Sequence, residues 1–292
     1  SYSDQWGIHG VKAAKELATS CRRWKKQGTR IFLLPQAFGP FKNPDLRSAM
    51  RTVLECADLV FARDQQSFDQ LAELGSGSNA LRLAPDFTAE LAHASKATTA
   101  PREGFFIIPN ARMVDSEGGV APELYLDFIV RVAEYAHQCE QHPFFLIHEG
   151  EGDRRLAEAV AQQVPFPLEI VEEDNALRSK AVIGASRAGL SSRFHGLVSA
   201  LAQAVPALGT GWSHKYRALF GAYGFEEGLL APSCTDAELR RVMDDLFDQS
   251  HYEKVVGRLQ ERGKALQGET DRMWDEIFER LSRSAPSARE KS

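Results

Sequence analysis

The sequence predicts an α/β fold built from two Rossmann-like domains, and three observations lead to this prediction. Short β-branched or aromatic runs alternate with helical stretches of ten or more residues, which is typical of βαβ units around a parallel sheet. A segment rich in Ala, Thr, Ser, Lys and Pro at residues 93–103 separates this alternation into two series. The chain of 292 residues is also long enough for two domains of roughly 150 residues each.

The first series contains three strands and two helices. Short apolar runs predict its strands at residues 30–34, 59–62 and 81–83. Asn43 and Pro44 predict the start of a helix that ends near residue 57, because Asn is a good N-cap and Pro fits the first helical position. A second helix, over residues 65–74, ends at Gly75. Three strands are few for an independent sheet.

The second series is longer and predicts a complete doubly wound sheet. Its strands are predicted at residues 105–108, 144–147, 168–171, 188–190 and 207–209. The helices between and after them are predicted near residues 122–139, 153–163, 175–183, 194–204 and 214–223. Two more helices, 235–247 and 251–283, precede a polar tail over 284–292 that we expect to be disordered. The predicted domain boundaries are therefore 1–98 and 99–250, followed by the helix and the tail.

Composition and charge narrow the class of protein. Hydrophobic residues make up 43% of the chain and charged residues 26%, which is typical of a globular protein. The 35 basic and 40 acidic residues give a net charge of −5, which argues against nucleic acid as a partner. The four cysteines lie far apart and form no metal-binding or disulfide pattern, which favours a reducing cytoplasm. No apolar run is long enough to span a membrane, and no signal peptide opens the sequence.

Polar residues follow most of the predicted strands. In open parallel sheets, ligands bind beyond the carboxyl ends of the strands, so these positions predict a cleft with donors from both domains. The residues of interest there are Gln36, Arg63, Asp86, His148, Arg193, His195 and Lys215. No Gly-rich dinucleotide or P-loop motif accompanies them, so we expect no nucleotide cofactor of those types.

Arg193-Phe194-His195 is the sharpest local feature, because it lies where a strand gives way to a helix. A helix N-terminus offers unpaired N–H groups, and an Arg and a His added there favour a phosphate or a carboxylate. Lys215 adds another cation from the next loop. In the alternative interpretation Arg193 pairs with a nearby carboxylate and His195 caps its helix. The spacing leaves both interpretations open.

The other polar residues allow structural interpretations as well. Asp64 is expected to cap the helix that follows it, which leaves Arg63 as the better ligand contact. Asp86 follows Pro85 and is at least as readily a turn residue as a cleft residue. Asp153 is expected to cap its own helix. His148, at the end of an apolar strand, is either an acid–base residue or a structural histidine, and the structural role is favoured.

Several of these segments together resemble the polysaccharide pyruvyl transferase family. The resemblance covers roughly residues 30 to 225, and the motifs occur in the order found in that family. They are Pro35-Gln36-Ala37-Phe38-Gly39-Pro40-Phe41, Arg63-Asp64 with Ser67 and Leu71, Ala84-Pro85-Asp86, Leu190-Ser191-Ser192-Arg193-Phe194-His195-Gly196-Leu197, Ala204-Val205-Pro206 and Gly211-Trp212-Ser213-His214-Lys215-Tyr216.

The resemblance implies a GT-B-like fold, in which two Rossmann-like domains face each other across a cleft and the helix over 251–283 packs back toward the first domain. It also implies transfer of pyruvate from phosphoenolpyruvate to two sugar hydroxyls as a cyclic ketal. Arg193 and His195 match the family's Arg-x-His motif and Arg63 its Arg-Asp motif, which would contact phosphoenolpyruvate. His195 would be the catalytic acid and base.

The implied substrate contacts also include Lys215, Gln36 and His148, with no cofactor and no metal. The acceptor would be a sugar or a lipid-linked oligosaccharide of a cell-surface or exported polysaccharide. The enzyme would then be cytoplasmic, either free or peripherally associated with the inner face of the membrane. The family's first domain begins with a further βαβ stretch, whereas this sequence starts at Ser1 near a later turn. We therefore expect an N-terminally truncated first domain.

Two alternatives come from other classes. A nucleotide-sugar glycosyltransferase of the same fold would need a carboxylate for the donor ribose, and Glu226 and Glu227 are the nearby candidates. A non-catalytic carbohydrate-binding remnant of the fold would keep the architecture without the reaction. Fold-level analogy does not separate these alternatives. A binding experiment separates them: the pyruvyl transferase binds phosphoenolpyruvate, whereas the glycosyltransferase binds UDP- or CMP-sugars.

Overall fold

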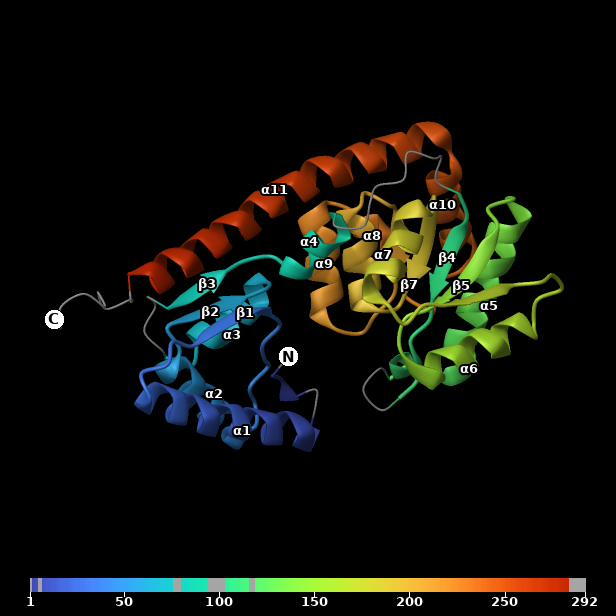
Figure 1. The fold of residues 1–292 in the computed structure, drawn as a ribbon. Coiled ribbons are helices and arrows are strands. Elements are labelled where there is room, and N and C mark those ends of the chain that lie inside the picture. The colour runs from blue at the N-terminus through green and yellow to red at the C-terminus, as the bar shows by residue number, and fades with distance from the viewer. Residues whose placement is uncertain (1, 5–6, 76–79, 94–102, 116–118, 284–292) are drawn as a thin grey trace. The chain divides into compact units, whose positions relative to one another are not determined.

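A computed structural model describes residues 2–4, 7–75, 80–93, 103–115 and 119–283 of the chain. The chain divides into two compact units (Figure 1). Unit 1 comprises residues 1–87 and 266–292, and unit 2 comprises residues 88–265. Most of the segment predicted as a linker, and the whole predicted tail, lie outside the described residues. Among the described residues, no helix combines the length and apolar character that crossing a membrane requires.

Unit 1 contains a three-stranded parallel sheet in the order β1-β2-β3. Its strands are β1 (Phe32–Gln36), β2 (Leu59–Ala62) and β3 (Leu81–Leu83). Its helices in the first part of the chain are α1 (Gly7–Lys26), α2 (Pro44–Cys56) and α3 (Gln65–Ala72). The predicted start of α2 is confirmed, because the Asn43 side chain accepts hydrogen bonds from the backbone of Asp45 and Leu46. The expectation of an N-terminal truncation stays a prediction.

The sheet of unit 1 packs against other residues on both faces, and its central strand β2 is fully buried. Successive side chains of a strand point to opposite sides. Leu33, Val60 and Ala62 belong to a core with α1 and α2. Leu59 and Phe61 belong to a second core with Met273 and Ile277 from the last helix. Figure 1 shows α1 and α2 on one face of the sheet and the end of the last helix on the other. Such strands read as continuous apolar runs, as predicted for them.

Unit 2 contains a five-stranded parallel sheet in the order β6-β5-β4-β7-β8. Its strands are β4 (Phe105–Ile108), β5 (Pro143–Ile147), β6 (Glu169–Glu172), β7 (Ala188–Ser191) and β8 (Ala207–Gly209). Its helices are α4 (Glu90–His93), α5 (Pro122–Gln138), α6 (Gly150–Ala161), α7 (Ala176–Ala185), α8 (Phe194–Ala202), α9 (His214–Tyr223) and α10 (Asp236–Phe247). The described residues also include the 3-10 turns η2 (Phe87–Ala89), η3 (Ala111–Met113) and η4 (Glu226–Gly228).

The strand order of unit 2 is that of a doubly wound sheet, because after β6 the chain returns to the other side of β4, where it forms β7 and β8. Helices α5 and α6 contact each other, as do α7 and α8, and Figure 1 shows the two pairs on opposite faces of the sheet. The two sheets are separate within the described residues, so the prediction of two Rossmann-like units is confirmed. A parallel sheet places the carboxyl ends of all five strands at one edge, where the following loops meet.

The last helix, α11 (Gln249–Ser282), contributes to both units. Its residues from Leu266 onward belong to unit 1. There Glu276 pairs with Arg82 of β3 at 3.0 Å, and Arg280 donates to the backbone carbonyl of Asp58 at 3.3 Å. Together with Met273 and Ile277 in the core, these contacts cover one face of the three-stranded sheet.

Candidate functional site

The loops after β4, β5 and β7 meet at the carboxyl edge of the unit 2 sheet, because these strands are neighbours in the order β5-β4-β7. A buried network of neutral hydrogen bonds holds two of the loops together. The Tyr125 hydroxyl donates to Ser192 Oγ at 2.7 Å and accepts from the backbone N–H of Asn110 at 3.0 Å. The Ser192 carbonyl accepts from Asn110 Nδ2 at 3.0 Å and from the Tyr216 hydroxyl at 2.9 Å. Burial raises the pKa of Tyr125, so its hydroxyl remains a donor.

Arg193 is the N-cap residue of α8 and directs its side chain across this edge toward the loop after β5. Its Nε and Nη2 donate to the two carboxylate oxygens of Asp153, at 2.8 and 2.7 Å. Its Nη1 donates to the Glu149 carboxylate. Burial would lower the pKa of Arg193, but the hydrogen bonds and charge of Asp153 and the charge of Glu149 raise it above the ordinary value. The guanidinium is therefore a permanent cation.

The pairing of Arg193 with nearby carboxylates is therefore confirmed. It does not exclude the anion-binding interpretation, because an arginine presents more than one donating edge. The second half of the alternative is wrong, since the cap position of α8 is Arg193 and His195 is the second helical residue. The His195 side chain is exposed, and its ring meets the Phe194 ring edge to face at 5.6 Å.

The prediction that Asp153 caps its helix is wrong. Helix α6 begins at Gly150, three residues earlier than predicted, and Glu149 occupies the cap position. Asp153 therefore lies in the first turn, where it is fully buried and accepts from the backbone N–H of Ala111 at 2.9 Å as well as from Arg193. One carboxylate thus connects the loops after β4 and β7 to the N-terminus of α6, whose dipole favours a negative charge.

His148 follows β5 and is half-buried. Its pKa is lowered first by burial and then by the charges of Arg193 and His195, with Glu149 opposing them and Lys180 adding to them. These influences place His148 near Arg193, His195, Lys180 and the Glu149 carboxylate at the carboxyl edge of the sheet. A titratable group whose pKa is shifted by burial and by specific neighbouring charges is typical of a functional site.

Lys180 is a residue that sequence reasoning missed. It lies on α7 and is 8% exposed, which is unusual for a lysine. Its Nζ donates to Ser199 Oγ at 2.7 Å, and Ser199 Oγ in turn donates to the backbone carbonyl of His195 at 2.7 Å. No sequence signal identifies it, since lysine is common on helices and only the packing of α7 against α8 brings it to the site.

Lys215 lies in the first turn of α9, and its Nζ is 5.2 Å from the centre of the Phe194 ring and 5.5 Å from that of Tyr216. The aromatic ring of the Arg-x-His segment therefore carries a cation on one face. This contact places Lys215 beside α8 in unit 2, next to the residues discussed above.

In unit 1, the predicted residues gather at the carboxyl edge of the smaller sheet. Arg63 Nη1 pairs with Asp86 at 2.7 Å, and the backbone N–H of Arg63 donates to the carbonyl of Gln36 at 3.1 Å. Asp64 caps α3 by accepting from the backbone N–H of Ser67 at 2.8 Å, as predicted. Asp86 is a partner of Arg63, with only 7% of its side chain exposed. Contacts of Arg63 and Gln36 with substrate, and a cleft shared with Arg193, stay predictions.

The family of the chain follows from a match to a family model. The model described as polysaccharide pyruvyl transferase matches residues 7–214, which is more than half of the chain. The chain belongs to the polysaccharide pyruvyl transferase family. The matched residues include every motif that carried the resemblance up to His214, and both Arg63 and the Arg193-Phe194-His195 segment. No curated protein matches the chain significantly.

Solved structures of other proteins share the fold of this family member. A Listeria monocytogenes protein described as a UDP-N-acetylglucosamine 2-epimerase has a TM-score of 0.63 at 13% identity, covering 92% of this chain and 72% of its own. The UDP-GlcNAc 2-epimerase from Neisseria meningitidis has a TM-score of 0.55 at 12% identity, covering 88% and 73%. A UDP-forming trehalose-phosphate synthase from Burkholderia xenovorans has a TM-score of 0.55 at 9% identity, covering 90% and 71%. The predicted GT-B-like α/β class is confirmed by these likenesses.

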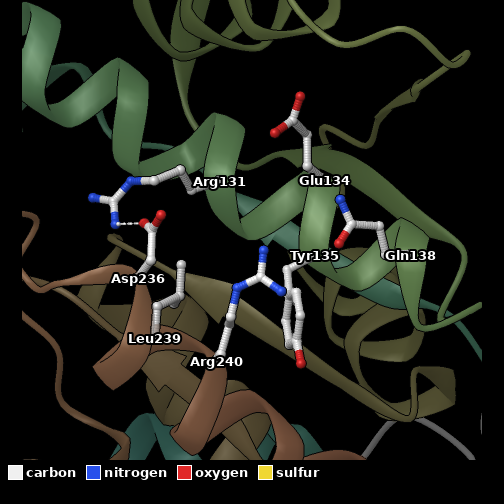
Figure 2. A pocket seen from close by; sticks show the side chains of 7 residues that line it. All are labelled: Arg131, Glu134, Tyr135, Gln138, Asp236, Leu239 and Arg240. Atoms are coloured by element: carbon white, nitrogen blue, oxygen red, sulfur yellow. Dashed lines mark hydrogen bonds and ion pairs between the residues drawn. The ribbon is translucent and has the colours of Figure 1, made fainter.

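A further cavity of about 80 Å³ lies between α5 and α10 (Figure 2). Arg131 donates to Asp236 there, and the Arg240 guanidinium lies 4.7 Å from the centre of the Tyr135 ring. A hydrogen bond to Asp244 raises the pKa of Tyr135 to about 12. Arg131 and Tyr135 lie in later turns of α5, and Asp236 and Arg240 lie on α10, whereas Tyr125 in the first turns of α5 reaches the loops of the site. The cavity is therefore separate from the family's Arg-x-His segment.

The lowered pKa of His148 predicts a pH dependence of stability. A histidine whose pKa is lower in the folded than in the unfolded state stabilises the fold above the unfolded value of about 6.5, and this contribution is lost as the pH falls below it. We expect the parent to lose more stability than His148→Gln between pH 7 and pH 5, measured as Tm. Above pH 7 the two curves should run parallel. Parallel curves over the whole range would contradict the prediction.

Proposed function

We propose that this member of the polysaccharide pyruvyl transferase family transfers pyruvate from phosphoenolpyruvate to two hydroxyls of a sugar, as a cyclic ketal. The observation that carries the proposal is the cluster of His148, Lys180, Arg193 and His195 where the loops of unit 2 meet the N-terminus of α8. Phosphoenolpyruvate carries a phosphate and a carboxylate on three carbons. Guanidinium forks and helix N–H groups suit both groups.

The reaction assigns a role to each group. A proton is added to C3 of phosphoenolpyruvate as one sugar hydroxyl oxygen bonds to C2 and loses its own proton. The second hydroxyl oxygen then bonds to C2 and gives up its proton to the departing phosphate, as the C2–O bond to phosphate breaks and inorganic phosphate is released. We assign proton donation to C3 to His195, which is exposed at the start of α8 and can act near neutral pH. Arg193 and Lys180 stabilise the phosphate as it leaves.

The remaining parts of the proposal concern partners and place. Arg63, Gln36 and Lys215 complete the substrate contacts, and the acceptor is a sugar or a lipid-linked oligosaccharide. No cofactor takes part, because phosphoenolpyruvate supplies the transferred group. The enzyme works in the cytoplasm, where phosphoenolpyruvate must be supplied by a reaction that makes an enol phosphate.

The second candidate function is that of a nucleotide-sugar glycosyltransferase. The observation in its favour is that one structural neighbour was solved with bound UDP-GlcNAc. This function requires a carboxylate for the donor ribose. Glu227 forms an ion pair with Arg258 of α11, so this carboxylate is engaged within the protein. Glu226, its neighbour in η4, is the other candidate.

The proposal predicts that phosphoenolpyruvate binds and that Arg193→Lys weakens this binding by about 1–3 kcal/mol, because lysine keeps the charge but loses the fork. Lysine also cannot reproduce the two-point contact that arginine makes with Asp153. Binding is measured by thermal shift and calorimetry with phosphoenolpyruvate, UDP-sugars and CMP-sugars in parallel.

Arg155→Lys is the matched control, because Arg155 is exposed on α6 and pairs with Glu151. It should bind phosphoenolpyruvate as the parent does. Stabilisation by a UDP-sugar and none by phosphoenolpyruvate would replace the proposed function with the glycosyltransferase. No response to either class of ligand would favour the non-catalytic remnant.

A further inference from the structure

Two carboxylates hold the guanidinium of Arg193, and they differ in burial. Asp153 takes the edge formed by Nε and Nη2 and has a fully buried side chain. Glu149 accepts from Nη1 at the outer edge, and 68% of its side chain is exposed. The Arg193 side chain between them is 12% exposed. The inner edge is therefore closed off, and the outer edge faces the side from which a ligand would approach.

The two carboxylates also differ in how firmly they are held. Asp153 lies inside α6 and accepts a third hydrogen bond from the backbone N–H of Ala111. Glu149 precedes the helix, and among the described residues its carboxylate has a hydrogen bond only from Arg193. The next residue, Gly150, has a φ of +74° and no atom within 4 Å of the place a Cβ would take. The Glu149 side chain can therefore rotate away without breaking any other hydrogen bond described for its carboxylate.

A carboxylate at the outer edge of Arg193 takes the place of an anionic ligand. Arginine binds carboxylates and phosphates through the same planar donors, so Glu149 and a substrate anion compete for Nη1. A phosphate carries close to two negative charges near neutral pH and a carboxylate carries one, so a phosphate gains more from the exchange.

We propose that Glu149 is an affinity- and specificity-determining residue: it occupies the outer edge of Arg193 until a phosphate-bearing substrate displaces it. Identification of that substrate as phosphoenolpyruvate rests on the proposed function. Glu149 thereby lowers the affinity of the site for every anion and excludes those with a single carboxylate most strongly. Asp153 acts differently, as the residue that positions Arg193.

The test measures binding of phosphoenolpyruvate, inorganic phosphate and pyruvate to the full chain by calorimetry. Glu149→Gln removes the competing charge and should bind phosphoenolpyruvate and phosphate about two- to fivefold more tightly than the parent, as expected for loss of an exposed ion pair. The affinity of Glu149→Gln for pyruvate should rise by at least the same factor, because pyruvate, with a single carboxylate, competes least well with Glu149 in the parent. Glu151→Gln is the matched control, since Glu151 lies two residues away, is exposed and pairs with Arg155. It should leave all three affinities unchanged.

Glu149→Asp provides a second variant, in which the charge is kept and the reach to Nη1 is shortened; it should also bind phosphate more tightly than the parent. Equal or weaker binding of phosphate and phosphoenolpyruvate by Glu149→Gln would overturn the inference and make Glu149 a support for Arg193. Tighter phosphate binding by the variant without any binding of phosphoenolpyruvate would leave the inference standing and reject the proposed function.

Discussion

His195→Gln should lower kcat by about 10²–10⁴-fold while leaving the affinity for phosphoenolpyruvate within a few-fold of the parent. Glutamine keeps a hydrogen-bond donor of similar size but cannot take up and release a proton. The substitution should not disturb the fold, since the His195 side chain is exposed and its backbone carbonyl still accepts from Ser199. The measurement is phosphate release from phosphoenolpyruvate that depends on a sugar acceptor, together with its pH profile. A limb of the parent's profile should be absent in the variant.

His9→Gln is a suitable control, because His9 is exposed on α1 in unit 1. It should keep the parent's turnover. If His195→Gln weakened phosphoenolpyruvate binding as much as Arg193→Lys and left turnover at saturation unchanged, His195 would be a ligand contact only. His148 would then be the next candidate for the proton donor, because it follows β5 at the same end of the sheet as His195.

Asp153→Ala is expected to destabilise the fold by about 3–5 kcal/mol, the usual cost of removing one partner of a buried ion pair. The substitution removes two hydrogen bonds from Arg193 and one from the backbone of Ala111. It leaves the Arg193 charge with Glu149 alone, whose side chain is mostly in solvent. Urea unfolding followed by circular dichroism measures the change, and phosphoenolpyruvate binding should fall as well because Arg193 is no longer positioned.

Glu151→Ala removes a carboxylate from the same turn of α6 and should cost less than about 1 kcal/mol, as is usual for an exposed ion pair. Asp153→Asn keeps an acceptor for the Ala111 amide, so its loss of stability should lie between those of Asp153→Ala and Glu151→Ala. A loss of under about 1 kcal/mol in Asp153→Ala would show that the Asp153–Arg193 pair does not hold the loops together.

Local sequence signals predicted the strands well. Leu59–Ala62 and Phe105–Ile108 are continuous apolar runs that end at polar residues, and both strands occur where predicted. The Asn-Pro start of α2 was equally clear, because the cap and the fixed backbone of Pro44 act within one turn. Signals of this kind depend on neighbouring residues, and the sequence contains them in full.

Helix α1 was not predicted, although it packs on the core of unit 1. Its buried positions are Gly10, Ala14, Ala18 and Cys21, whose spacing is helical but whose side chains are small. Small residues give a weak apolar stripe, and their stabilisation comes from close approach to α2 and not from large buried area. The sequence pattern cannot show that approach.

The sequence predicted where the residues of the site lie along the sheet, but not which of them form ion pairs and hydrogen bonds with one another. Residues that follow strands, such as Arg193 and His148, could be placed at the carboxyl edge, because sheet geometry requires it. The role of Asp153 depended on where α6 begins, and an error of three residues changed it from a cap to an ion-pair partner. The place of Lys180 depended on the packing of α7 against α8, through its bond to Ser199, which is 19 residues away in sequence.

The hydrogen bonds around Ser192 decide whether the entropy cost of ordering the site arises when the protein folds or when a ligand binds. Tyr125, Asn110 and Tyr216 fix the backbone of this loop with uncharged partners inside unit 2. The entropy cost of ordering the backbone at the start of α8 is therefore already met when the unit folds. Little of this cost remains to weaken the binding of a ligand there. Added salt screens charged contacts at the surface and should leave this inner arrangement unchanged.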